Sequence, residues 1–343
     1  MEAKPATIAE RSGKKRFFEH REMDYYLAWI MGREIFEGSD AVECLETAAR
    51  IADGQVASWQ AEWTRLAERV EAQASQALQD GDLKTARKAY LRACTYYRAP
   101  LFIMDPADDR FFDLWEKMHL CFRRAAKLFD PPIENVWVPY EGKLLQGYFW
   151  KAGDSAGVRP ALIVAGGIET FAEDCYFMVG PYGSRRGYHV LAVDLPGQGV
   201  NPAQGLYFEA RMEMPVRAVV DYALARPEID PGRLALFGFS WGGHIVFKAA
   251  EHEPRIKALI ANPAMPDVFR AALAQQQGSH GRSDPVARTA FQQIAWRFGL
   301  KISFRLQDLF RRFGKAVDYL RYGKADVRRI RMPVLCIAGE GEA

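Results

Sequence analysis

The spacing of apolar residues changes once along the chain, near residue 131. Between residues 20 and 130, glycine and proline are scarce, and apolar side chains recur at intervals of three and four. This is the period of an amphipathic helix, and Gly54 and Gly81 mark expected breaks between helices. We predict that residues 1–130 form an N-terminal helical cap domain.

That region is rich in large aromatic side chains. They are Trp59, Trp63, Tyr90, Tyr96, Tyr97 and Trp115. Aromatics of this kind are usually core residues, and lining an apolar pocket is the alternative.

From residue 131 to 343, short apolar runs alternate with segments that can hold helices. The first, "ENVWVPYEGKLLQGYFWKA", predicts a hairpin that turns at Glu141-Gly142. The others are "PALIVAGG" (160–167), "GYHVLAVDLPGQG" (187–199), "RLALFGFS" (233–240), "IKALIANP" (256–263) and "MPVLCIAG" (332–339). Such runs are typical of strands buried on both faces, and their alternation with helices indicates a mostly parallel sheet. The prediction is an α/β domain with a helical lid insertion at about 266–330.

Composition and charge narrow the function classes. The chain is 49% hydrophobic and 26% charged, and its net charge of +3 comes from 46 basic and 43 acidic residues. This balance argues against nucleic-acid binding, and the basic stretch at 310–332 is best explained as a solvated helix face. We find no secretory signal and no apolar run of membrane-spanning length, so the default is a cytoplasmic protein without a membrane partner.

The five cysteines are scattered and odd in number. This argues against a disulfide framework and against a structural zinc site. We therefore expect no cofactor and no metal.

One motif carries chemistry, the sequence "GFSWG" at 238–242. It has the form G-x-S-x-G, with an apolar strand before it and the helical segment "GGHIVFKAAEHE" after it. In this context Ser240 is predicted to lie on a strained strand-to-helix turn, with glycines two positions away on each side to make room for its neighbours. The amide of Trp241, at the start of the helix, is the first expected oxyanion donor. The second should come from the loop after "PALIVAG", where Gly167 and Ile168 offer amides and Ile168 is favoured.

From about residue 131 onward the chain resembles an α/β-hydrolase. The segments "GGIE", "AVDLPGQG", "GFSWGG" and "EPRIKALIANPA" are similar to serine hydrolases related to FrsA and to 2,6-dihydroxypseudooxynicotine hydrolase. Fungal hydrolases that shorten pigment polyketides belong to the same group, and the resemblance includes the helical N-terminal region. It implies a Ser-Asp/Glu-His triad that cleaves C–C bonds beside ketones, or esters.

The resemblance places the triad acid after a late strand, where "GEGEA" supplies Glu342, with Glu340 as the fallback. Asp194 and Glu169 lie near the predicted site but outside the triad. Asp194 is expected to anchor its own turn, and Glu169 is a candidate for binding substrate or water.

The family's histidine follows the acid, and the printed sequence stops at Ala343 without one. It also stops before the last strand and helix expected of such a fold. We therefore expect the gene product to continue with a loop that carries this histidine; His280 is the internal alternative.

Together these residues predict a serine hydrolase that cleaves a C–C bond beside a ketone, or an ester or thioester, of an acyl or polyketide-like substrate. A plain carboxylesterase and a non-catalytic, partner-binding hydrolase fold are the alternatives. A further interpretation is that two copies of the chain form a homodimer through their N-terminal helices.

Overall fold

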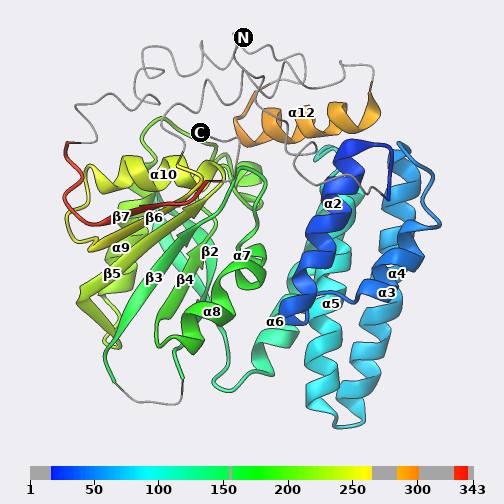
Figure 1. Ribbon diagram of the computed structural model, residues 1–343, viewed down its shortest axis with the longest axis horizontal. Helices are drawn as coiled ribbons and strands as arrows, with labels where there is room; N and C mark the ends of the chain where they lie inside the picture. Colours follow the sequence, from blue (N-terminus) through cyan, green and yellow to red (C-terminus); the bar gives the residue numbers. More distant parts are fainter. Residues whose placement is uncertain (1–16, 154–156, 265–283, 301–327, 339–343) are drawn as a thin grey trace. The chain divides into compact units, whose positions relative to one another are not determined.

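The computed structural model describes residues 17–153, 157–264, 284–300 and 328–338 (Figure 1). The chain divides into two compact units. The first comprises Met1–Pro132 with Gly278–Gln293, and the second comprises Ile133–Gln277 with Ile294–Ala343. Each is described by itself.

The first unit is helical. Its elements before residue 132 are α2 (Arg21–Met31), the 3-10 helix η1 (Gly32–Phe36), α3 (Ala41–Ala48), α4 (Val56–Gln79), α5 (Leu83–Leu101) and α6 (Arg110–Lys127). Gly54 and Gly81 lie between helices with positive φ angles of 70° and 79°, which confirms the predicted breaks. Asp40 and Asp82 cap α3 and α5 by accepting the amides of Glu43 and Thr85 at 3.0 Å.

Long helices α4, α5 and α6 pack in sequence around an aromatic core. Trp59 and Trp63 are fully buried, with ring centroids 5.6 Å apart. Tyr90, Tyr96 and Tyr97 are buried as well. The pocket-lining alternative is therefore wrong for these five aromatics, because they fill the space between helices. Trp115 is half-buried and stacks on His119.

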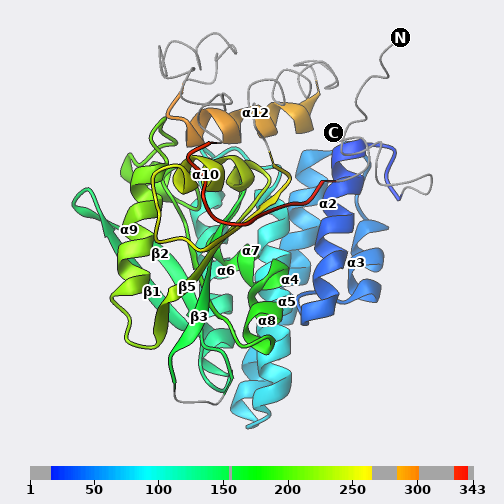
Figure 2. The same ribbon diagram turned by 60° about the vertical axis from the view of Figure 1, so that its left-hand side comes forward.

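The second unit is built on a mixed sheet. Its strands are β1 (Glu134–Tyr140), β2 (Lys143–Trp150), β3 (Arg159–Ala165), β4 (His189–Val193), β5 (Ile229–Phe239), β6 (Ala258–Asn262) and β7 (Val334–Cys336). In the described residues their order is β1-β2-β4-β3-β5-β6-β7. Figure 2 shows the sheet from a second side, with β1, β2, β3 and β5 labelled. β1 and β2 form the predicted hairpin and β2 pairs antiparallel with β4, whereas all later pairs are parallel. The prediction of a mostly parallel α/β sheet is confirmed.

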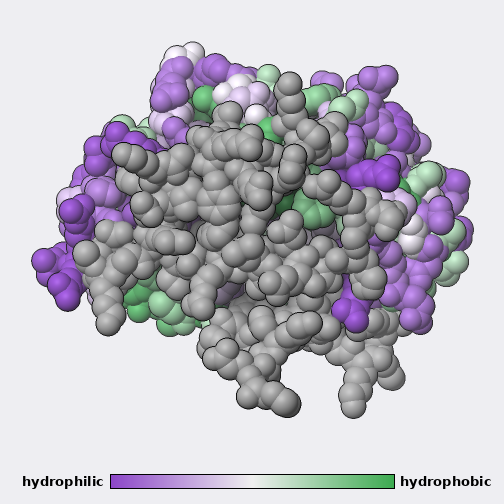
Figure 3. Space-filling model, turned by 90° about the horizontal axis from the view of Figure 1, so that it is seen from above, coloured by the Kyte–Doolittle hydropathy of each residue, from purple (hydrophilic) through white to green (hydrophobic). Residues whose placement is uncertain are grey.

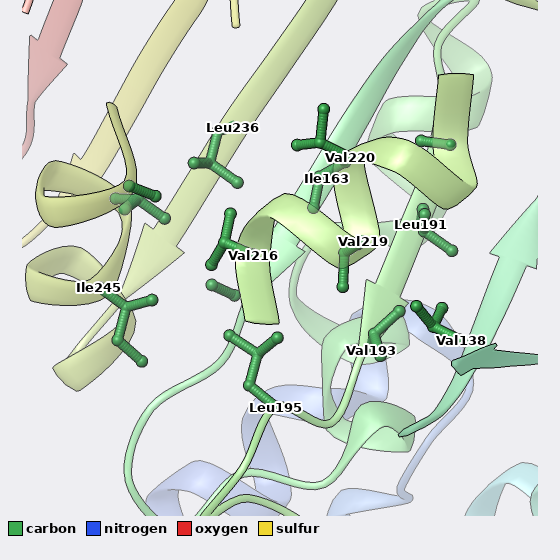
Figure 4. Close-up of a cluster of buried hydrophobic side chains, with 14 of the residues drawn as sticks. Val138, Ile163, Leu191, Val193, Leu195, Val216, Val219, Val220, Leu236 and Ile245 are labelled. Atoms are coloured by element: carbon green, nitrogen blue, oxygen red, sulfur yellow. The ribbon is translucent and has the colours of Figure 1, made fainter. Parts of the chain in front are cut away.

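Helices cover both faces of this sheet. They are α7 (Ala172–Met178), α8 (Gly180–Arg185), α9 (Glu213–Leu224) and α10 (Trp241–Ala250), and the 3-10 helix η2 (Asn201–Gln204) lies in a loop. Valines of α9 pack onto strand residues such as Leu191 and Leu236 in one buried cluster (Figure 4). On the other face, Gly183 of α8 lies directly against Val190. The alternation of Val190 and Leu191 between faces follows from the two-residue period of a strand.

Burial on both faces does not hold for every strand. Val334 and Leu335 of β7 are 40% and 55% exposed. Among the described residues β7 pairs only with β6, so it has a neighbour on one side and few contacts on its faces. The continuous apolar run predicted the strand correctly and its burial wrongly.

The described surface seen in Figure 3 is mostly hydrophilic, and hydrophobic residues form small areas between the polar ones. Within the described ranges, no helix is both long and apolar enough to cross a membrane.

Candidate active site

Ser240 stands at the junction of β5 and α10. It has φ of 54° and ψ of −128°, a conformation that costs a residue with a β-carbon roughly 1–3 kcal/mol. Two backbone bonds fix it, because its amide donates to the Asn262 carbonyl at 2.7 Å and its carbonyl accepts the Gly243 amide at 2.9 Å. The side chain is exposed. This is the strained strand-to-helix turn that the motif predicts.

Three glycines make this turn sterically feasible. A β-carbon at Gly238 would overlap the backbone of Gly242, and one at Gly242 would overlap the Ala165 carbonyl oxygen at the end of β3. Gly243 lies equally close to the carbonyl of Pro263. The expected need for glycines around the serine is confirmed, since strand, helix and neighbouring strand meet here without side chains between them.

The loop after β3 passes directly beside Ser240. A β-carbon at Gly167 would lie 3.0 Å from Ser240 Cβ and 3.3 Å from its Oγ. Ile168, the next residue, is half-buried and packs on the core of the unit. Trp241, as the first residue of α10, has an amide that no acceptor within the helix can satisfy. The residues predicted to form an oxyanion hole are thus close in space to the serine or adjacent to it in sequence.

Behind this loop lies a group of buried carboxyls. Asp194 follows β4 and Glu173 belongs to α7; both are almost inaccessible to solvent. Burial, together with the nearby charge of Glu173, raises the pKa of Asp194 well above its ordinary value. Glu173 accepts the Tyr148 hydroxyl at 2.7 Å, and Asp174 accepts the Phe171 amide at 3.0 Å.

The carboxyl of Asp194 lies against Gly199 of its own turn, because a β-carbon at Gly199 would overlap Asp194 Oδ2. That Asp194 anchors this turn stays a prediction. The turn is also held by Asn201, whose side-chain amide donates to the carbonyls of Asp194 and Leu195 at 2.7 and 3.1 Å. A hydrogen-bonding interaction with the Ala172 amide, at the start of α7, partly offsets the raised pKa of the Asp194 carboxyl.

Of the predicted lid insertion, residues 284–300 and 328–330 are described, and the first of these segments includes α12 (Pro285–Arg297). Arg297, at the end of this helix, is 1% exposed and donates to the carbonyls of Gly197 at 2.9 Å and Gly199 at 3.4 Å. It also donates to the Glu169 carbonyl at 3.4 Å. One guanidinium therefore bonds both the loop after β3 and the loop after β4.

Phe298 extends this contact to the nucleophile turn. Its ring lies 5.6 Å from that of Trp241 and 5.0 Å from that of Phe208. Arg297 and Phe298 were not identified from sequence, because their partners lie far away along the chain. The carboxylate-bearing Glu169 is half-buried beside them.

Three candidates lie outside the described residues: Glu342, Glu340 and His280. Three other histidines of this unit are described, and one of them, His252, follows α10 with its Nε2 3.8 Å from Glu251 Oε2. His189 lies in β4, where its Nδ1 accepts the Ala152 amide at 3.1 Å, and burial lowers its pKa. His244 is buried in α10, with its ring centroid 6.0 Å from that of Trp241.

Among the described residues of the helical unit, one set of side chains could bind a metal ion. His20, Glu22 and Asp284 place ligand atoms within 4.8 Å of one another. His20 Nε2 lies 2.9 Å from Asp284 Oδ2. We therefore interpret the three side chains as a hydrogen-bonded contact within that unit and not as a metal site. All five cysteines are free thiols, and only Cys336 is exposed.

Comparison with known proteins gives consistent matches. The family model described as "Esterase FrsA-like" matches residues 41–279. Hydrolase ORFZ of Pyricularia oryzae is 30% identical, over 93% of this chain and 82% of the relative. The 20-hydroxy-prefusarin hydrolase FUS2 of Gibberella moniliformis is 32% identical, over 79% and 70%. Alpha/beta hydrolase xenA of Xenoacremonium sinensis is also 32% identical; the match covers 69% of this chain and 58% of xenA.

Solved structures agree on the fold. The 2,6-dihydroxy-pseudo-oxynicotine hydrolase aligns with a TM-score of 0.72 and 22% identity, over 88% of this chain and 79% of that chain. AbyA5 aligns with a TM-score of 0.66 and 20% identity, over 92% and 79%. At these identities the likeness concerns the architecture.

Proposed function

Because this chain belongs to the FrsA-like esterase family and has an α/β-hydrolase fold, we propose that it is a serine hydrolase acting through an acyl-enzyme, with Ser240 as the nucleophile. The observation that carries the proposal is the conformation of Ser240. An exposed serine is held at a positive φ between three glycines, with the Gly167 backbone beside its Oγ. Proteins retain such strain where the surrounding structure requires that geometry, and most often at functional sites.

In the proposed reaction, Ser240 Oγ attacks a substrate carbonyl, and the oxyanion that forms accepts hydrogen bonds from the amides of Trp241 and of Ile168 or Gly167. A histidine removes the serine proton and later gives it to the leaving group. Glu342, or Glu340 in its place, orients that histidine. His280 and a histidine following Glu342 in the gene product are the two candidates for the base.

Water then attacks the acyl-enzyme carbonyl, with the same histidine as base, and Ser240 leaves with its proton restored. If the substrate is a ketone, the bond that breaks joins the carbonyl carbon to a neighbouring carbon. That carbon must leave as a stabilised anion, so a β-diketone or an acylated phenol is the logical class. An ester or thioester releases an alcohol or thiol by the same steps.

The relatives support an oxygenated acyl or polyketide-like substrate, since one of them is a 20-hydroxy-prefusarin hydrolase. We further propose that the helices of residues 1–130 and the insertion at about 266–330 cap the site. Contacts of Arg297 and Phe298 with the loops around Ser240 support that role for the insertion.

The test is labelling with a fluorophosphonate, which reacts only with activated serines. We would compare this chain, its Ser240→Ala and His280→Ala variants, and the longest form that the gene encodes. Labelling at Ser240 of the longest form alone supports the family histidine, whereas labelling of this chain that is lost in His280→Ala identifies the internal base. Failure of every form to label would favour a partner-binding protein.

Substrate choice needs a second assay on the labelled form. Rates with short aryl esters and with acylphenols separate a plain carboxylesterase from an enzyme that cleaves C–C bonds. If the enzyme turns over aryl esters but not acylphenols, it is a plain carboxylesterase.

A further inference from the structure

A buried glutamine lies behind the loop that passes Ser240. Gln198, in the "PGQG" turn after β4, is 1% exposed. Its Nε2 donates to the carbonyls of Gly166 at 2.6 Å and Gly167 at 3.0 Å. Its Oε1 accepts the Leu195 amide at 3.0 Å. The amide orientation is fixed, because only the oxygen can accept the Leu195 N–H and only the nitrogen can donate to carbonyls.

These bonds determine where two backbone amides point. In a planar trans peptide, the C=O and N–H groups point in opposite directions. The cis peptides of the described chain lie elsewhere, at Asp130-Pro131 and Asn262-Pro263. Since Gln198 draws the carbonyls of Gly166 and Gly167 toward itself, the N–H groups of Gly167 and Ile168 are directed away from it.

Two candidate oxyanion donors thus receive their direction from one side chain. Gly167 lies on the Ser240 side of the loop, as the 3.3 Å from its ideal β-carbon position to Ser240 Oγ shows. The glycine at 167 is also free to rotate either peptide, because it lacks a side chain. Within the loop, the Gly167 carbonyl also accepts the Thr170 amide at 3.5 Å, and Gln198 is the partner that the carbonyls of Gly166 and Gly167 share.

We propose that Gln198 is the positioning residue of the oxyanion loop, holding the amides of Gly167 and Ile168 ready for a substrate oxyanion. The inference rests on the proposed function of Ser240. Gln198 touches no reacting atom; it acts through the two carbonyls. Preorganised donors stabilise an oxyanion because they need no reorganisation when charge develops, so the benefit appears in the transition state rather than in substrate binding.

The loop offers a matched control. Asn201 is also a buried amide, and it too donates two hydrogen bonds to backbone carbonyls, but to those of Asp194 and Leu195 in its own turn. Q198M and N201L each remove one buried amide of similar size and two donated bonds. Only Q198M releases the oxyanion loop.

The experiment measures kcat and KM for p-nitrophenyl butyrate, and inhibition by a phenyl trifluoromethyl ketone, whose adduct places an oxyanion at the site. Q198M should lower kcat by about 10- to 100-fold with little change in KM. The inhibition constant of the ketone should rise in parallel. N201L, compared at equal folded fraction, should keep kcat within about threefold. Q198N, whose amide is one methylene shorter, is the second variant should Q198M fail to fold.

Crystal structures of both variants give a readout that needs no activity. In Q198M, the carbonyl of Gly166 or Gly167 should turn away from position 198, and in N201L both should stay. Equal losses of kcat in the two variants, or unchanged carbonyl directions in Q198M, would overturn the proposal. If neither the wild-type chain nor the longest form that the gene encodes labels at Ser240, the proposed function fails instead, and the crystal structures alone decide the role of Gln198.

Discussion

Gly167 and Ser240 lie so close that a β-carbon added at Gly167 would stand 3.0 Å from Ser240 Cβ. Ser240 Cβ is attached directly to a backbone that two hydrogen bonds fix, so it cannot move away. A side chain at 167 must therefore displace the loop after β3.

The first prediction is that Gly167→Ala leaves the fold intact and lowers activity. A shift of the loop by a fraction of an ångström moves the expected oxyanion donors, and kcat should fall by about 10²-fold. Steady-state kinetics and thermal melting check this. Gly157→Ala is the control, because a β-carbon there meets no atom within 4 Å. Equal kinetics for the two variants would show that the loop tolerates the shift.

The second prediction concerns backbone strain at Ser240. A glycine at this position removes the strain of φ 54° from the folded state, which is worth roughly 1–3 kcal/mol. It also makes the unfolded chain more flexible, which lowers stability by about 0.5–1 kcal/mol. Ser240→Gly should therefore exceed Ser240→Ala in free energy of unfolding by about 1 kcal/mol. Urea unfolding measures the difference, and neither variant should label with a fluorophosphonate. If Ser240→Ala is the more stable of the two, strain is not stored at the turn.

The third prediction concerns pH. Burial and the Glu173 charge raise the pKa of Asp194, so the folded protein keeps a proton that the unfolded chain releases above about pH 4. The free energy of unfolding contributed by this group therefore falls as the pH rises from there toward the raised pKa. Asp194→Asn keeps an oxygen for the Ala172 amide and removes the titration.

Urea unfolding of wild type and Asp194→Asn between pH 5 and pH 8 provides the measurement. The stability of the variant relative to wild type should increase with pH until the raised pKa of Asp194 is reached. Glu173→Gln should reduce the slope in wild type, because it removes the charge that opposes ionisation of Asp194. Parallel pH curves for wild type and Asp194→Asn would contradict the assignment.

The fourth prediction concerns Arg297. Its buried guanidinium donates hydrogen bonds to three carbonyls. Its positive charge also lowers the pKa of Asp194 and so opposes the effect of burial. Arg297→Met leaves these groups without a donor and should cost about 3 kcal/mol of unfolding free energy. Denaturant unfolding checks the value. Arg288→Met, on an exposed position of α12, should change stability by less than about 0.5 kcal/mol. Similar losses in both variants would mean that the helix, rather than the contact, is responsible.

Much of the fold could be predicted from sequence, because its signals are local. Strand runs and turn glycines appear in the sequence as spacing and composition, and the Glu141-Gly142 hairpin formed as expected. Burial was less predictable. The apolar run of β7 is exposed, since burial depends on which neighbours a strand receives.

In the candidate site, too, some features could be predicted from the sequence and others could not. The sequence by itself determined the turn at Ser240, because a strand, a helix and glycines in immediate succession impose one backbone geometry. Only the tertiary structure decided that Gln198 meets carbonyls 31 and 32 residues away, and that Arg297 meets one 100 residues away. A hydrogen-bonding side chain does not specify its partner; the partner is whichever group the packed chain brings within reach.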